Sequence, residues 1–285
     1  MLSPFPLTEE LLCMFVAYLG KQNLTHQTIK SYLSAIRFLS ISSGQGDPFS
    51  PGSLPVLQYV LRGIKRMPKA PGHVRLPITP AILRSLKRQW APHAAEETYV
   101  MLWAACCVGF FGFLRAGEFT VSSNREFDPS SALTLEDVAV DQHANPSMIQ
   151  INLKQSKTDP FRHGVDIFLG RTNMDLCPVA ALLAYIAVRP PVPGPLFVYP
   201  DGSFLTRDKL VASVRQALQG AGMDPSNYSG HSFRIGAATT AAQAGLEDSV
   251  IKMLGRWEST AYQRYICTPR STLAAISAQL VAGTQ

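Results

Sequence analysis

Several kinds of sequence signal are missing from this chain. Charged residues make up only 16% of the 285 residues and hydrophobic residues 46%, which favours large packed cores over disorder. The five cysteines form no CxxC pair, which argues against a zinc site or a disulfide framework and for a reducing compartment. No apolar run reaches the length of a membrane span, and no signal-peptide pattern begins the chain. We therefore expect a soluble intracellular protein with no metal, no cofactor and no membrane partner.

The charge that is present has a positive excess. Lysine and arginine number 26 against 20 aspartates and glutamates, a formal net charge of +6. Such a balance favours a polyanionic partner such as nucleic acid. Because many basic proteins bind no nucleic acid, this charge by itself is weak support.

The length and the helical patterns predict two domains. Apolar residues recur at helical spacing through the first third of the chain, as at Leu12 and Val16. The stretch after Arg66 is rich in proline and basic residues and has no periodicity, which is typical of a linker. We predict a helical domain over residues 1–67, a linker over 68–78 and a second domain over 79–285.

The second predicted domain mixes helices with a few strands. Thr79-Pro80 is typical of a helix start, and residues 96–113 form an almost wholly apolar stretch that indicates a buried helix. Short apolar or alternating segments predict strands at 133–135, 149–153 and 165–168. The fold class expected is mainly α with a small antiparallel β-sheet (α+β).

Four short segments carry candidate chemistry, and each has an ordinary explanation when taken alone. Arg115 follows the buried helix, and its ordinary role there is to satisfy the C-terminal carbonyls of that helix. The segment 154–159 reads equally as a solvated hairpin. His231 and Arg234 lie three residues apart, so a helix beginning there places both on one face, but the HxxR pattern is common. Around Trp257, aromatic core packing is the usual explanation.

Taken in order, these segments resemble the active site of the tyrosine recombinase (phage integrase) family. The motifs that carry the resemblance are Arg115, Lys157, His231-x-x-Arg234, Trp257 and Tyr265. The stretches GHSFRIGAA (230–238), LGRW (254–257) and YQRYI (262–266) look most like the recombinases of DIRS-, Ngaro- and Crypton-like transposable elements and retrotransposons of eukaryotes. The resemblance covers nearly the whole chain. It implies a core-binding (SAM-like) DNA-binding domain followed by a catalytic domain, and a nuclear location.

The chemistry of phosphodiester transfer explains why these residue types recur. A phosphorane gains negative charge on its non-bridging oxygens, and Arg115 and Arg234 suit that charge because a guanidinium can donate two parallel hydrogen bonds. A tyrosine phenol has a pKa near 10, so His231 would assist loss of its proton. The resemblance implies that Tyr265 forms a 3′-phosphotyrosyl link, that Lys157 protonates the leaving 5′ oxygen and that Trp257 donates its indole N–H to the phosphate. Glu118 would support the site through Arg115 or His231.

Two assignments within the motifs have rivals. Trp257 and Tyr265 are eight residues apart where relatives commonly have nine, so Tyr262 competes with Tyr265 as the nucleophile. Tyr265 is preferred because the Gln-Arg-Tyr-Ile ending matches the family. In the hairpin, Ser-Lys-Thr matches the family at Lys157, so Lys157 is preferred over Lys154 as the catalytic lysine.

The expected partner is double-stranded DNA. Five basic residues on the predicted N-terminal helices are candidate phosphate contacts, although a solvated helix face explains them equally well: Lys30, Arg37, Arg62, Lys65 and Arg66. An apolar strip near the C-terminus predicts a final helix that packs on its own core or docks into a second copy, giving a dimer or tetramer on DNA. The leading hypothesis is an active site-specific recombinase of a mobile element. A domesticated, non-catalytic DNA-binding protein and a type IB topoisomerase are the alternatives.

Overall fold

The computed structural model describes residues 7–50, 54–67, 75–156, 159 and 163–267. The chain divides into two compact units, Met1–Gly72 and His73–Gln285, which are treated separately below. Within the described residues, no helix is long and apolar enough to span a bilayer. The predicted C-terminal docking helix falls at 268–285, outside the described residues.

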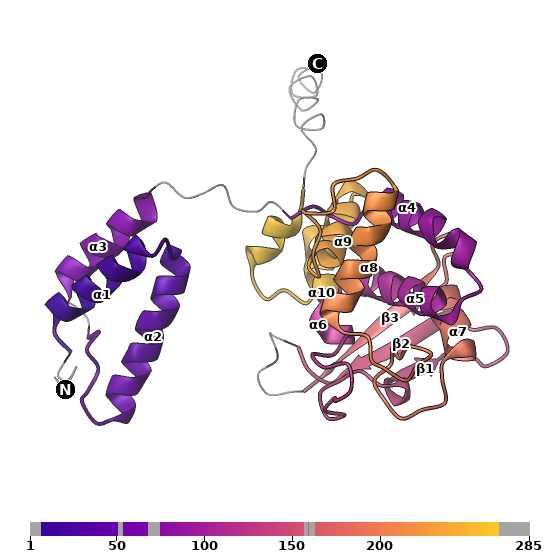
Figure 1. Cartoon of the computed structure of the whole chain (residues 1–285), viewed down its shortest axis with the longest axis horizontal. Coiled ribbons are helices and arrows are strands. Elements are labelled where there is room, and N and C mark those ends of the chain that lie inside the picture. Colours follow the sequence, from indigo (N-terminus) through magenta and orange to yellow (C-terminus); the bar gives the residue numbers. More distant parts are fainter. Residues whose placement is uncertain (1–6, 51–53, 68–74, 157–158, 160–162, 268–285) are drawn as a thin grey trace, which may run out of the picture. The chain divides into compact units, whose positions relative to one another are not determined.

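The first unit is built from three helices around a small apolar core (Figure 1). They are α1 (Glu9–Lys21), α2 (His26–Ser42) and α3 (Pro55–Arg66). Thr8 and Thr25 cap the first two helices through their side-chain oxygens. Leu54 gives α3 no such cap, and the Glu9 carboxylate of α1 instead accepts a hydrogen bond from Leu57 N at 3.0 Å. A carboxylate of α1 therefore accepts a hydrogen bond from a free backbone N–H in the first turn of α3.

The second unit surrounds one buried helix, α5 (Glu97–Phe111), whose residues 101–110 are buried apart from Trp103. The helices that pack on α5 include α4 (Pro80–Trp90), α7 (Pro178–Val188) and α9 (Ser232–Gln243). The short helix α6 (Ala116–Phe119) and the helices α8 (Arg207–Gly220) and α10 (Asp248–Gly255) complete the helical part. Three 3-10 turns are η1 (Ala91–His93), η2 (Leu135–Asp137) and η3 (Thr260–Tyr265). The segment with the two tyrosines, Tyr262 and Tyr265, is thus a 3-10 helix.

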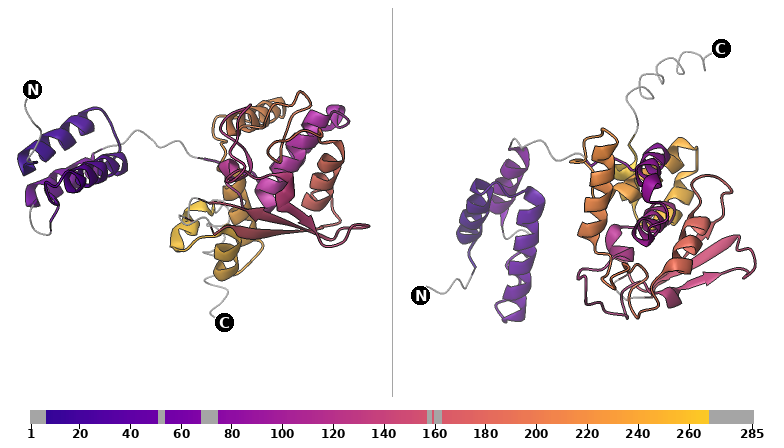
Figure 2. Two further views of the ribbon diagram at one scale, coloured as in Figure 1. Left: turned by 90° about the horizontal axis from the view of Figure 1, so that it is seen from below. Right: turned by 45° about the vertical axis from the view of Figure 1, so that its right-hand side comes forward.

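A three-stranded antiparallel sheet lies on one side of this helical body (Figure 2). Its strands are β1 (Val138–Val140), β2 (Met148–Leu153) and β3 (Val165–Gly170), in the order β1-β2-β3. On β2, Ile149 and Ile151 point inward and pair with Leu169 and Ile167 of β3. The predicted fold class is confirmed: the chain is mostly helical with one small antiparallel sheet.

The strand predicted at 133–135 is wrong. The Asp137 carboxylate accepts hydrogen bonds from the backbone N–H and the hydroxyl of Thr134, both at 2.8 Å, and closes the 3-10 turn η2. Side-chain to backbone bonding of this kind competes with strand pairing. The first strand begins only at Val138, after the turn.

The end of the predicted linker is built into the second unit. Residues 68–74 lie outside the described part of the chain, but Leu76 N donates to Asn227 O and Ile78 N to Ser232 O, each at 2.9 Å. Ile78 is fully buried. A Cβ on Gly236 of α9 would lie 1.8 Å from the carbonyl oxygen of Ile78, so α9 can approach this segment only because residue 236 lacks a side chain.

We predict that Gly236→Ala destabilises the second unit by about 1–3 kcal/mol, because the added methyl must displace the backbone at Ile78. Urea unfolding followed by tryptophan fluorescence measures the change. Gly170→Ala is the matched control, because a Cβ there meets nothing within 4 Å. Equal unfolding midpoints for the two variants would contradict this account of the close approach.

Candidate active site

The turn between α5 and α6 positions the first two site residues. Arg115 occupies the N-cap position of α6. Glu118, in the same short helix, accepts a hydrogen bond from the Arg115 backbone N–H at 2.9 Å with one carboxylate oxygen. Its other oxygen accepts from Arg115 Nη1 at 2.7 Å. Because the Glu118 side chain is only 6% exposed, this pair is held in a largely dry environment.

A third residue, Arg256, completes this ion pair. Its Nη2 lies 3.0 Å from Glu118 Oε2, the oxygen that also accepts from the Arg115 backbone N–H, and its Nη1 donates to Gly112 O at 3.1 Å. Burial lowers the pKa of Arg256 and the neighbouring Glu118 opposes that shift. Glu118 therefore supports Arg115 as expected, but its other partner is Arg256 and not His231. Arg256 stands in the LGRW stretch of the sequence, but no local pattern predicts its contact with Glu118.

His231 and Arg234 open α9 but face different surroundings. His231 precedes the helix and lies in a polar groove, whereas Arg234 is fully buried. The Arg234 guanidinium donates to Phe113 O at 2.7 Å through Nη1 and to Gly255 O through Nη2. Burial, together with the nearby charge of Arg115, lowers the pKa of Arg234 to about 9.

Trp257 and Tyr265 cover the Arg234 guanidinium. Arg234 Cζ lies 4.2 Å from the Trp257 ring centroid and 5.8 Å from that of Tyr265. The Trp257 and Tyr265 rings are 5.2 Å apart. A Cβ on Gly255 would overlap the indole at 1.5 Å, so this arrangement requires a glycine before Arg256. The Trp257 indole nitrogen is buried, and no hydrogen-bond partner for it is found in the described residues.

The two tyrosines of η3 have different partners. Tyr262 is buried and its phenol hydrogen-bonds to Asp248, an interaction that raises its pKa. Tyr265 instead packs on the Trp257–Arg234 pair. The hydroxyl of Thr239, in α9, donates to Tyr265 O and accepts from Cys267 N, both at 3.0 Å. The surroundings therefore favour Tyr265 over Tyr262 as the reactive tyrosine.

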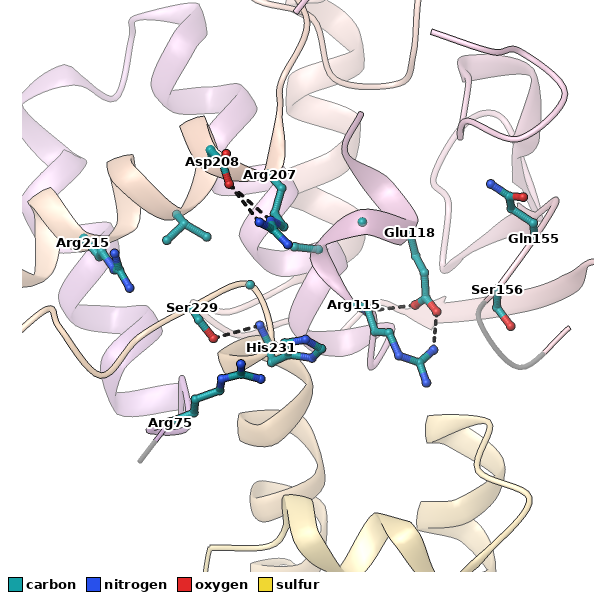
Figure 3. A pocket seen from close by; sticks show the side chains of 14 residues that line it. Arg75, Arg115, Glu118, Gln155, Ser156, Arg207, Asp208, Arg215, Ser229 and His231 are labelled. Atoms are coloured by element: carbon teal, nitrogen blue, oxygen red, sulfur yellow. Dashed lines mark hydrogen bonds and ion pairs between the residues drawn. The ribbon is translucent and has the colours of Figure 1, made fainter. Parts of the chain in front are cut away.

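A polar groove of about 680 Å³ runs beside these residues (Figure 3). Arg115, Glu118 and His231 line one part of it. Further polar side chains come from α8, from the entry to the second unit, from the β2–β3 hairpin and from the turn before α9: Arg207, Asp208, Arg215, Arg75, Gln155, Ser156 and Ser229. Four arginines thus face one groove, and three of them (Arg75, Arg207 and Arg215) carry no motif that the sequence could reveal.

The cations lower the pKa of the groove histidine. Burial makes the largest contribution, followed by the charges of Arg75 and then Arg115, and each disfavours the imidazolium form of His231. The imidazole is therefore neutral near pH 7 and is able to accept a proton. Its backbone N–H donates to Ser229 Oγ at 3.4 Å, which ties it to the preceding turn.

The two candidate lysines, Lys154 and Lys157, both belong to the stretch of sequence between β2 and β3. Lys154 Nζ lies 2.8 Å from Asp137 Oδ2 and donates to Pro129 O at 2.9 Å, so Lys154 anchors β2 to the preceding loop. Lys157 lies outside the described residues. The two residues that directly precede it, Gln155 and Ser156, line the groove.

The candidate DNA contacts of the first unit all lie on exposed helix surfaces. Arg37 is already paired with Asp47, with Nε–Oδ1 at 3.0 Å. Arg62 lies over the Tyr59 ring at 5.6 Å, and Lys65 and Arg66 follow one turn later on α3. Lys30 projects from α2. Among the residues with a described position, no group of three or more potential metal ligands is found.

Comparison with known proteins identifies the fold. No protein-family model and no curated protein matches the chain. Among solved structures, XerA recombinase matches at 17% identity and TM-score 0.52, covering 98% of this chain and 84% of that one. The Tn1549 transposon integrase in complex with transposon right end DNA matches at 14% identity and TM-score 0.61, covering 98% and 87%. XerH recombinase in its post-cleavage complex matches at 14% identity and TM-score 0.61, covering 95% and 70%. The chain has the fold of the tyrosine recombinases.

We predict that His231 titrates below the ordinary histidine pKa of 6.5, and that Arg75→Gln raises this pKa by removing the largest charge contribution. NMR titration of the imidazole in labelled protein measures both values. Arg84→Gln is the control, since Arg84 pairs with Asp175 and does not line the groove. A wild-type His231 that titrates at or above 6.5 would contradict the predicted electrostatics.

Proposed function

We propose that this protein is a site-specific DNA recombinase that cleaves and rejoins DNA through a 3′-phosphotyrosyl intermediate. One observation carries the proposal. Arg115, His231, Arg234, Trp257 and Tyr265 come from three distant parts of the sequence and gather beside one arginine-lined groove, on a tyrosine recombinase fold. The solved relatives include recombinases and an integrase bound to DNA, which supports DNA as the substrate.

In the proposed reaction, the Tyr265 oxygen attacks the scissile phosphorus and the bond from phosphorus to the 5′ oxygen breaks. Neutral His231 takes the phenolic proton, and Lys157 gives a proton to the leaving 5′ oxygen. Arg115 and Arg234 neutralise the charge that builds on the non-bridging oxygens, and the Trp257 indole N–H adds a further donor. Attack by the 5′ hydroxyl of a second strand then releases Tyr265 and reseals the DNA.

The buried position of Arg234 adds one requirement to this reaction. Its guanidinium is covered by the rings of Trp257 and Tyr265, so contact with phosphate requires the Tyr265 ring to move. We infer that phosphate binding and release of Tyr265 from Arg234 occur together.

The biological setting follows from the sequence motifs. The GHSFRIGAA and LGRW stretches support action for a DIRS-, Ngaro- or Crypton-like mobile element in the nucleus. Assembly as a dimer or tetramer on DNA, through the C-terminal segment, belongs to the same proposal. The second candidate function is a domesticated DNA-binding protein that keeps the fold without catalysis. It is favoured by the full burial of Arg234, whose two terminal nitrogens both donate to backbone carbonyls.

We predict that the protein forms a denaturation-resistant adduct with nicked suicide duplexes, and that Tyr265→Phe abolishes it while Tyr262→Phe does not. The duplexes are drawn from candidate element termini and a randomised pool. Gel electrophoresis in denaturant, followed by peptide mapping of the adduct, identifies the linked residue. If only Tyr262→Phe abolishes the adduct, the nucleophile is Tyr262 and not Tyr265. DNA binding without an adduct from any variant would favour the non-catalytic alternative.

We predict that replacing Arg62, Lys65 and Arg66 together with glutamine weakens DNA binding and flattens its salt dependence. Each lost phosphate contact reduces the slope of log K against log salt by about 0.9. Fluorescence anisotropy over a salt series measures the slope. Arg37→Gln changes it less than any single one of the three, because Asp47 already neutralises Arg37. An unchanged slope in the triple variant would remove this α3 surface from the DNA interface.

A further inference from the structure

The backbone at Arg256 adopts a conformation that arginine disfavours. It forms the C-cap of α10 with φ 54° and ψ 47°, in the left-handed region. Among the described residues, the other non-glycine residues with positive φ are Asn23, Asn173 and Phe113. Asparagine tolerates this region, and glycine would enter it without strain. An arginine at a position suited to glycine indicates that its side chain has a role.

The Arg256 side chain is also buried at a cost. It is 12% exposed, and its Nε is buried with no hydrogen-bond partner found in the described part of the chain. The contacts that offset this cost are few. Its terminal nitrogens reach Glu118 Oε2 at 3.0 Å and three backbone carbonyls: Gly112 O at 3.1 Å, Phe113 O at 3.4 Å and Leu254 O at 3.4 Å.

Those contacts connect Arg256 to both proposed phosphate-binding arginines. Glu118, its carboxylate partner, holds Arg115 through the other oxygen at 2.7 Å. The Phe113 carbonyl also accepts from Arg234 at 2.7 Å. Arg256 itself does not line the groove. It touches the supports of the two arginines without facing the position where a phosphate would bind.

We propose that Arg256 is a positioning residue: it fixes the Glu118 carboxylate, and with it the Arg115 guanidinium, and it holds the Phe113 carbonyl that anchors Arg234. This inference rests on the proposed recombinase function. Without Arg256, Glu118 keeps one cationic partner and gains rotational freedom, so Arg115 loses a fixed orientation. Preorganised donors stabilise developing charge only while their orientation is fixed.

The test uses Arg256→Gly, which removes the side chain and the backbone strain together. We expect a thermal unfolding midpoint and a DNA affinity close to those of wild type. We expect the rate of covalent adduct formation to fall about 10- to 100-fold, the usual effect of losing a residue that orients a ligand-contacting group. Arg256→Lys keeps the charge but cannot bridge Glu118 and the carbonyls in the same way, so it restores little of the rate. Asn173→Gly is the matched control, because it relieves the same backbone conformation elsewhere in the second unit.

A substrate with a methylphosphonate at the scissile position separates positioning from a merely structural role. The methyl group removes the negative charge that Arg115 and Arg234 neutralise. If Arg256 acts through them, the rate ratio of wild type to Arg256→Gly shrinks toward one on this substrate, as the ratio for Arg115→Gln does. A structural defect in Arg256→Gly would lower the rate of adduct formation by the same factor on both substrates, and that result would overturn the inference.

The remaining outcomes distinguish the inference from the function on which it rests. If wild type forms the adduct and Arg256→Gly forms it at the same rate, the positioning role is wrong and the recombinase function stands. If wild type forms no adduct on any duplex, the proposed function is overturned and the positioning role is overturned with it.

Discussion

The candidate site depends on one buried carboxylate. Glu118 lies between Arg115 and Arg256. Arg234 lies close enough for the charges of Arg115, Glu118 and Arg256 to shift its pKa. Cations taken out of water repel one another, and burial disfavours their charged forms. The structure offsets this with the carboxylate, with the carbonyls of Gly112, Phe113 and Gly255, and with the Trp257 ring. Neutralising Glu118 would leave this arginine cluster without its counter-charge.

The same positive potential organises the groove outside the cluster. Burial lowers the pKa of His231 most, and the charges of Arg75, Arg115, Arg234 and Arg207 lower it further, so the groove combines fixed cations with a neutral imidazole. That combination suits a phosphodiester, which needs charge neutralisation and a proton acceptor at the same place. The aromatic residues have a complementary effect, because Trp257 and Tyr265 shield Arg234 from water.

The rigid framework beneath the site explains how such short segments keep their places. The buried helix α5 supports the turn that carries Arg115, and the segment ending at Ile78 packs on α9 at Gly236. Lys154 anchors β2 to the loop before it, and Gln155 and Ser156, which follow Lys154, line the groove. Thr239 holds the backbone of Tyr265 through its hydroxyl. Each contact joins segments far apart in the sequence.

Local periodicity and residue type predicted the long helices and two of the three strands, and they also gave the order of the motifs along the chain. The strand expected at 133–135 failed because a side chain, Asp137, bonds the backbone of Thr134 and closes a turn. The Gln-Arg-Tyr-Ile ending favours Tyr265 in the sequence, and the tertiary structure adds that Tyr265 packs on Trp257 whereas Tyr262 bonds to Asp248. Arg75 and Arg207 carry no sequence motif, and only the tertiary structure places them on the groove. Arg256 stands in the LGRW stretch, but its pairing with Glu118 spans 138 residues and leaves no local pattern. Local patterns report backbone preference and burial, whereas ion pairs and stacked rings depend on which distant segments the core brings together.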